Sequence, residues 1–162
     1  MEGQWAAPHF LGKEVNSFKT HWQFSIATNE NLYLSVNDTI MISVFDGKAH
    51  LKPKPLKLQN NTNMQGMMPY IAPDESYILY SIRKNKADKF SDLYISYRLK
   101  NGKWTDPVNL GSDINTAKNE YLPIVSGDGK YLFFVSNREE GDFLRFWVSA
   151  KIIEKLKPKE LK

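Results

Sequence analysis

Residues 102–138 read GKWTDPVNLGSDINTAKNEYLPIVSGDGKYLFFVSNR, and this stretch decides the fold. It opens with a Gly-x-Trp-x-x-Pro string and closes with two short apolar runs, residues 121–125 and 131–136, on either side of the polar turn SGDGK. Short runs rich in β-branched and aromatic residues, separated by Gly, Asp and Ser, are typical of β-strands joined by tight turns. The rest of the chain consists of weaker copies of this stretch.

The internal repeats predict the architecture. Each copy offers four short strands in meander order, and four-stranded antiparallel sheets arrayed radially are the blades of a β-propeller. The sequence therefore predicts an all-β fold, a partial or open β-propeller of about three four-stranded antiparallel blades. The repeat is clearest at Pro69, Asp74 and Tyr77, which recur as Pro123, Asp128 and Tyr131, with Gln23 in the place of the proline in the first copy.

These residues resemble the WD40-like β-propeller repeat of TolB-type proteins, which centres on a pattern like P-x-x-S-P/x-D-G-K-x-L-x-F-x-S. The string PIVSGDGKYLFFVSNR from Pro123 matches it almost throughout. The copy from Pro69 has Glu75 where the pattern has the turn glycine, and the copy from Gln23 has lost the aspartate as well. The resemblance covers nearly the whole chain up to Ser149. It implies the propeller fold and a periplasmic or cell-envelope location, and it does not specify an activity.

We expect residues 1–150 to form the blades and residues 151–162 to form a basic C-terminal tail. The first blade strand, residues 4–10, is partial, because Gly3, Trp5, Pro8 and Leu11 repeat the spacing of Gly102, Trp104, Pro107 and Leu110. The tail carries five Lys and two Glu, most of the net charge of +4, so the body is close to neutral. No basic groove with interleaved aromatic residues is visible, and we expect no nucleic-acid partner.

Several kinds of chemistry have no support in the sequence. The chain has no cysteine, and its three histidines stand in no metal-ligand spacing, so we expect neither a metal nor another cofactor. No run approaches the roughly 18 apolar residues of a membrane span. The N-terminus lacks the basic start and apolar stretch of a signal peptide, so we expect none in this chain.

Most residues of the repeat motif have a structural interpretation. Asp74 and Asp128 stand where a carboxylate can accept backbone N–H bonds in the turn between the first two strands of a blade, and Gly129 permits a positive φ there. We expect these three residues to be structural turn residues. Trp5 and Trp104 are expected to pack between neighbouring blades.

The candidate ligand-binding residues are polar and flank the innermost strand of the last blade. We predict that they lie near the mouth of a central channel, where amide, carboxylate and guanidinium groups could hold a peptide or a glycan. The alternative is a network that holds the loops together, without a ligand. The residues are Asn115, Asn119, Glu120, Asn137 and Arg138.

The leading functional hypothesis is a non-catalytic binding module for a protein, peptide or glycan. The alternatives are a carbohydrate-active enzyme, a glycoside hydrolase or lyase, and a fragment that lacks an independent function. An enzyme would need a pair of channel-facing carboxylates. Glu120 is the only obvious acid there, so we predict no catalytic residue from this chain.

The sequence leaves open how the blades form a closed ring. Propellers typically have four to eight blades, and an open set of three would expose the faces of its first and last blades. Either N-terminal blades are missing, or two copies form a homodimer in which each N-terminal strand completes the partner's last blade. The start in mid-repeat favours missing blades.

Overall fold

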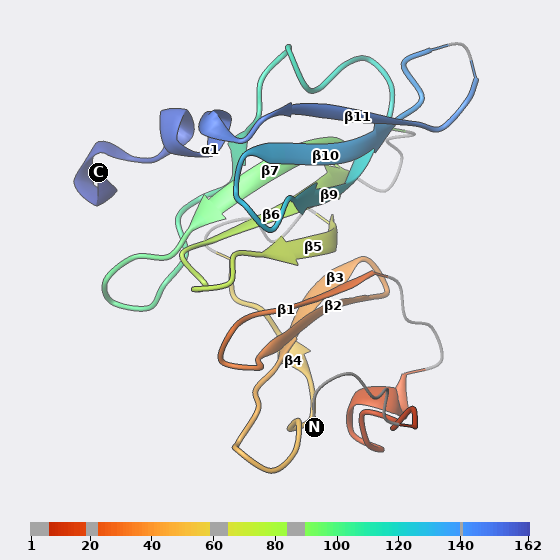
Figure 1. Ribbon diagram of the computed structural model, residues 1–162, viewed down its shortest axis with the longest axis vertical. Helices are drawn as coiled ribbons and strands as arrows, with labels where there is room; N and C mark the ends of the chain where they lie inside the picture. The colour runs from red at the N-terminus through yellow and green to blue at the C-terminus, as the bar shows by residue number, and fades with distance from the viewer. Residues whose placement is uncertain (1–6, 19–22, 59–64, 84–89, 140) are drawn as a thin grey trace.

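Three antiparallel sheets follow one another along the chain (Figure 1). The computed structural model describes residues 7–18, 23–58, 65–83, 90–139 and 141–162. The all-β fold and the antiparallel blades are confirmed, and the sheets do not close into a ring. The strands are β1 Phe24–Ile26, β2 Leu32–Val36, β3 Thr39–Ser43 and β4 Lys54–Pro55 in the first sheet; β5 Gln65–Ile71, β6 Tyr77–Arg83, β7 Asp92–Tyr97 and β8 Val108–Asn109 in the second; β9 Glu120–Val125, β10 Tyr131–Ser136 and β11 Leu144–Ser149 in the third.

Each sheet is a meander in which every strand pairs with the next one in sequence. The first two sheets end in edge strands of two residues, β4 and β8, and the prolines of the first edge explain its brevity because proline cannot donate to a ladder. In the third sheet β11 pairs only with β10 among the described residues. The third sheet therefore presents a free edge of six residues.

The two ends of the chain differ from expectation. The predicted strand at residues 4–10 lies partly outside the described residues, and residues 7–10 form no strand. Residues 12–18, which include a 3₁₀ turn at Val15–Ser17, cover the outward face of the first sheet. The predicted tail begins with the helix α1, Lys151–Leu156, whose Ile153 is 5% exposed. The division into domains at residue 150 stays a prediction, but the first part of the tail belongs to the core.

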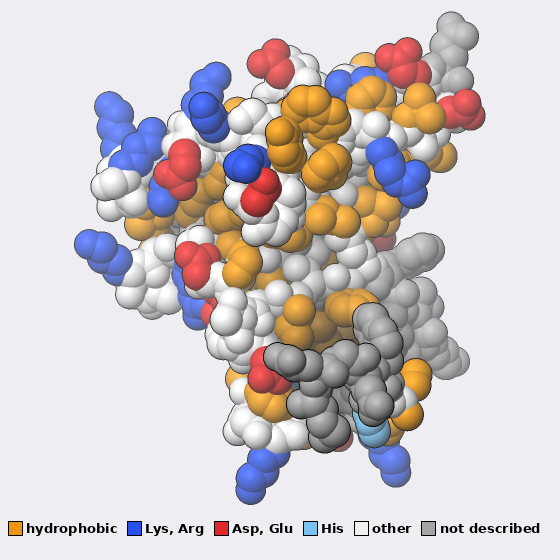
Figure 2. Space-filling model, viewed as in Figure 1, with side chains coloured by type: hydrophobic (Ala, Val, Ile, Leu, Met, Phe, Trp, Pro, Cys, Tyr) orange, Lys and Arg blue, Asp and Glu red, His pale blue; other side chains and the backbone are white. Residues whose placement is uncertain are grey.

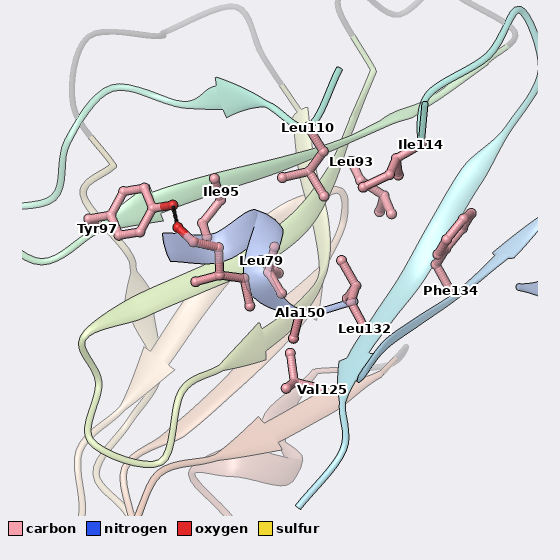
Figure 3. Close-up of a cluster of buried hydrophobic side chains, with 11 residues drawn as sticks. Leu79, Leu93, Ile95, Tyr97, Leu110, Ile114, Val125, Leu132, Phe134 and Ala150 are labelled. Carbon is pink, nitrogen blue, oxygen red and sulfur yellow. Dashed lines mark hydrogen bonds between the residues drawn. The ribbon is translucent and has the colours of Figure 1, made fainter. Parts of the chain in front are cut away.

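The hydrophobic core lies between the sheets. Odd-numbered residues of β6 face the third sheet and even-numbered residues face the first, so Leu79 and Ile78 are both completely buried. This arrangement explains the continuous apolar run of β6, because a strand covered on both faces has no polar side. Figure 3 shows the cluster between the second and third sheets, where the Tyr97 hydroxyl donates a 2.5 Å hydrogen bond to the Ile153 carbonyl.

The turns after β5 and β9 have the same backbone form with different residues. Gly129 has a φ of 71° and Glu75 a φ of 58°, so the glutamate adopts the left-handed conformation that favours glycine. Asp128 accepts hydrogen bonds from the Ser126 hydroxyl and the Lys130 N–H, and these bonds hold the pKa of its carboxyl below its usual range. Asp74 likewise accepts the Ser76 N–H.

Glu75 joins the first two sheets. Its carboxylate accepts hydrogen bonds from Asn31 Nδ2 (2.9 Å) and the Tyr33 hydroxyl (2.7 Å) of the first sheet, and it forms an ion pair with Arg98 after β7. Burial disfavours the charged carboxylate, but these hydrogen bonds and Arg98 outweigh it and lower the pKa of Glu75 below its ordinary 4.5. The residue that breaks the glycine pattern therefore links two blades.

We expect Glu75→Gln to lower the free energy of unfolding by about 2 kcal/mol at pH 7, the scale of hydrogen bonds to a charged group. A depressed pKa gives stability that is present above pH 4.5 and is lost as the pH falls through the folded-state pKa, so the difference between parent and variant should shrink as the pH falls below 4.5. Urea unfolding across this range measures both values. The exposed Glu30→Gln is the control, and a parent–variant difference independent of pH would contradict this assignment.

Candidate functional site

The predicted polar residues do lie together, around Glu120 at the start of β9. Glu120 is completely buried, and its carboxylate accepts hydrogen bonds from the Thr116 N–H (2.9 Å) and hydroxyl (2.7 Å) and from the Ser136 hydroxyl (2.7 Å). Arg138 Nη2 lies 3.5 Å from Glu120 Oε1. Both carboxylate oxygens are thus occupied by groups of the same chain. A ligand could reach Glu120 only if this network opened.

Arg138 holds the loop before β9 against the turn after β10. Its guanidinium donates to the Ile114 carbonyl (2.5 Å) and to the Ser136 hydroxyl (3.1 Å). Its Cζ also lies 5.3 Å from the centroid of the Phe134 ring and 4.8 Å from that of Phe146. These cation–π distances fix the guanidinium over the core, with the side chain only 21% exposed.

The three asparagines bind backbone groups of β7 and of the segments that lead into β7 and β9. Asn115 is 8% exposed, and its amide accepts the Leu93 N–H (2.8 Å) and donates to the Leu93 carbonyl (2.9 Å), as a paired strand would. Asn119 accepts the Ser91 N–H, and Asn137 accepts the Asn119 N–H. The geometry therefore supports the loop-scaffold interpretation of this cluster. A direct ligand role for these five residues stays a prediction.

A second surface was missed by the sequence interpretation. It is the outward side of the third sheet, where Ile124, Tyr131, Phe133 and Trp147 are 49%, 40%, 41% and 62% exposed. We call these four residues the aromatic face. Tyr131 and Trp147 meet edge to face with ring centroids 5.2 Å apart, and Phe133 pairs across the sheet with both Ile124 and Trp147. Figure 2 shows apolar side chains gathered over the third sheet.

The repeat shows what such a face normally contacts. Strand register places Tyr131 and Phe133 at the positions of Tyr77 and Leu79, and Trp147 at that of Ile95. Leu79 and Ile95 are completely buried against the third sheet. The aromatic face is thus a blade surface of the kind that another polypeptide covers. Sequence alternation could have shown the two faces of β10, but not that one of them lacks a neighbour.

An apolar hollow of about 380 Å³ adjoins the aromatic face. It lies between β1 of the first sheet and the outward side of the third. Gln23 Oε1, at its first-sheet side, is buried without a hydrogen-bond partner among the described residues. The lining residues are Gln23, Phe24, Leu122, Ile124, Phe133, Phe134, Val135 and Arg145.

The described residues hold no cluster of three or more His, Asp or Glu side chains that could bind a metal ion. No helix in the described part of the chain is long and apolar enough to cross a membrane.

Comparison with known proteins supports the fold but no specific function. No protein-family model matches the sequence, and no curated protein sequence matches it. Among solved structures, TolB from Acinetobacter baumannii aligns over 80% of this chain and 30% of its own, with a TM-score of 0.51 and 12% identity. A putative TolB from Agrobacterium tumefaciens aligns over 82% and 59%, with a TM-score of 0.45 and 13% identity, and the tricorn protease over 78% and 12%, with 0.42 and 14%. The chain thus spans less than a third of the first of these proteins and about three fifths of the second.

We expect Glu120→Gln to destabilise the fold by about 2 kcal/mol or more, because an amide cannot accept all the hydrogen bonds that converge on a buried carboxylate. Urea unfolding with the exposed Glu139→Gln in the loop after β10 as control measures the effect. A Glu120→Gln protein as stable as its parent would return Glu120 to the list of ligand-binding candidates.

Proposed function

We propose that this chain is a non-catalytic β-propeller module that binds a polypeptide through the aromatic face. The observation that carries the proposal is the exposure of Phe133 and Trp147 at positions whose equivalents, Leu79 and Ile95, are completely buried by a neighbouring sheet. Contiguous exposed apolar surface of this kind marks interaction sites in soluble proteins.

A polypeptide fits this surface better than a glycan or a small polar ligand. The aromatic face offers large apolar side chains for the centre of an interface, and the hollow beside it could take an aliphatic or aromatic anchor. The free edge of β11 adds unpaired backbone groups that an extended peptide could use. The polar residues first considered for a ligand are engaged with backbone and side chains of the same chain.

The carbohydrate-active enzyme receives less support from this geometry. Glu120 is the acid on which it would depend, and its two oxygens already accept three hydrogen bonds within the chain. A periplasmic or envelope location remains part of the proposal. It rests on the resemblance of residues 123–138 to the TolB-type repeat.

The test is peptide selection. A displayed library of random peptides selected on the parent protein should yield binders rich in aromatic and aliphatic residues. Replacing a central aromatic anchor typically costs about 2 kcal/mol, so Trp147→Lys should weaken these peptides roughly thirtyfold in a fluorescence-polarisation titration. Leu51→Lys is the matched control, because Leu51 is 48% exposed on the first sheet's side of the molecule. Peptides that bind parent and Trp147→Lys equally would place the site elsewhere and overturn the proposal.

A further inference from the structure

Residues 7–16 repeat the sequence and the turn conformation of residues 106–115, which pack against the second sheet. Residues 3–17 match residues 102–116 without a gap at Gly, Trp, Pro, Leu, Gly and Asn. The structure extends the match, because Gly12 and Gly111 have φ angles of 94° and 87°. The Asn16 N–H donates to the Gly12 carbonyl (3.2 Å) just as the Asn115 N–H donates to the Gly111 carbonyl (2.8 Å).

In the second sheet this piece has a defined role. Its residues Val108 and Asn109 form the fourth strand β8 on β7, and the Leu110 N–H donates to the Leu93 carbonyl (3.1 Å). Leu110 is 3% exposed, and the Asn115 amide holds both backbone groups of Leu93. The piece therefore completes a sheet by closing the edge of its third strand.

Among the described residues, the N-terminal copy has no such sheet to complete. The first sheet already has its fourth strand in β4, so residues 7–11 have no edge there to complete. Leu11, at the position of Leu110, is 44% exposed, and Phe10 is 70% exposed. The Asn16 amide donates to the carbonyl of Gly12 in its own turn. Val15 nevertheless packs on the first sheet with 2% exposure, as Ile114 packs in the cluster with the third sheet.

The third sheet has the complementary gap. β11 is a free third strand among the described residues, and register makes its Trp147 and Arg145 equivalent to Ile95 and Leu93 of β7. In Figure 1, β11 and the N-terminal segment lie at opposite ends of the molecule. Three blades are also too few to close a ring, since propellers need at least about four. The described residues of one chain therefore present both the donor and the acceptor, at opposite ends of the molecule.

We propose that a second copy of this chain completes the third sheet. Residues 7–11 of each copy add to β11 of the other as its fourth strand, and the aromatic face packs against the partner's first sheet. Two such contacts are related by a twofold axis and close a ring of six blades. This inference rests on the proposed function, because it names the partner of the same aromatic face.

The first sheet has exposed residues where the partner would pack. Phe24 and Ile26 are 61% and 52% exposed on the side of β1 that faces away from the second sheet. Register makes Ile26 equivalent to Ile71, which is 1% exposed against the first sheet. Both sides of the proposed interface therefore expose residues that are buried where one blade meets the next. Arg145 at the position of Leu93 is an exception, so this interface would be less apolar than the one between the second and third sheets.

Light scattering on the purified full chain is the first test. We expect a mass of about twice 18.7 kDa at micromolar concentration. Leu11→Asp should give a monomer, because a buried carboxylate would replace the equivalent of Leu110. Leu51→Asp, which changes a leucine of similar exposure in the connection between β3 and β4, should remain a dimer. A folded monomer of the parent would overturn the inference.

Crosslinking tests the register, because the chain has no cysteine of its own. The pair Ile95 and Val108 of β7 and β8 predicts that Trp147 of one copy lies opposite His9 of the other. A mixture of His9→Cys and Trp147→Cys chains, treated with a short bis-maleimide, should give a crosslinked dimer that each variant alone does not. Crosslinking of Trp147→Cys by itself would indicate packing of two aromatic faces and would overturn strand addition. His9→Cys mixed with Lys103→Cys is the negative control.

The two proposals fail separately. If the parent is a monomer but Trp147→Lys still abolishes peptide binding, the aromatic face binds a different polypeptide and only the second-copy inference is lost. If the chain is a dimer in the predicted register and selects no peptide, the polypeptide that the aromatic face binds is the second copy, and only the binding of separate peptides is lost.

Discussion

The burial of one sheet against the next is the constraint on which this structure depends. A four-stranded antiparallel sheet of short strands is too small to have a core of its own, so each blade buries its apolar residues against its neighbours. The second sheet is covered on both faces, and its strands β6 and β7 contain the completely buried residues Ile78, Leu79, Leu93 and Ile95. The outer sheets satisfy the same constraint on one face only. The first sheet uses residues 12–18 to cover most of its outward side, and no described residues give the third sheet an equivalent cover.

Polar residues fix the position of each blade relative to the next. Glu75 joins the first and second sheets through Asn31, Tyr33 and Arg98. Between the second and third sheets, the Asn115 amide hydrogen-bonds both backbone groups of Leu93, as a neighbouring strand would. Glu120 binds the backbone of Thr116, the next residue of the same loop. Both carboxylates are buried, and both carry several hydrogen bonds that compensate their lost hydration. Hydrophobic burial therefore brings the sheets together, and these networks select one arrangement of them.

Local signals made most of the fold predictable from the sequence. The strand at residues 131–136 was predicted with the bounds that the structure shows, because polar turns flank it on both sides. The sequence did not show that residues 12–18 cover most of the outward side of the first sheet, since the segment around Val15 has no strand-like pattern. From the sequence, Glu75 was only a departure from the turn glycine. Its role in joining two sheets could not be predicted, because its partners Asn31 and Tyr33 are distant in sequence.

The candidate site was less predictable for a physical reason. A polar residue beside a blade rim has the same sequence signature whether it binds a ligand or a backbone group of the next strand, and only the distances separate the two roles. Asn115 illustrates this, since its two hydrogen bonds to Leu93 use the amide that a ligand would need. The aromatic face could not be predicted for a different reason: the sequence around Phe133 is typical of a buried strand in any blade. Its exposure depends on the absence of a neighbouring sheet, a property of the assembly and not of the strand.

The repeated turn at Gly12 and Gly111 shows that local sequence determines the conformation of this segment, whereas the rest of the fold determines where it packs. The two turns share a left-handed glycine and an asparagine that closes on the glycine carbonyl, although one precedes the first sheet and the other precedes the third. Their conformation is therefore set by the segment itself. Which third strand such a segment completes is decided by where a free edge exists. For residues 102–116 that edge is β7 of the preceding repeat, and for residues 3–17 the described chain offers only β11, in a sheet that another copy can reach.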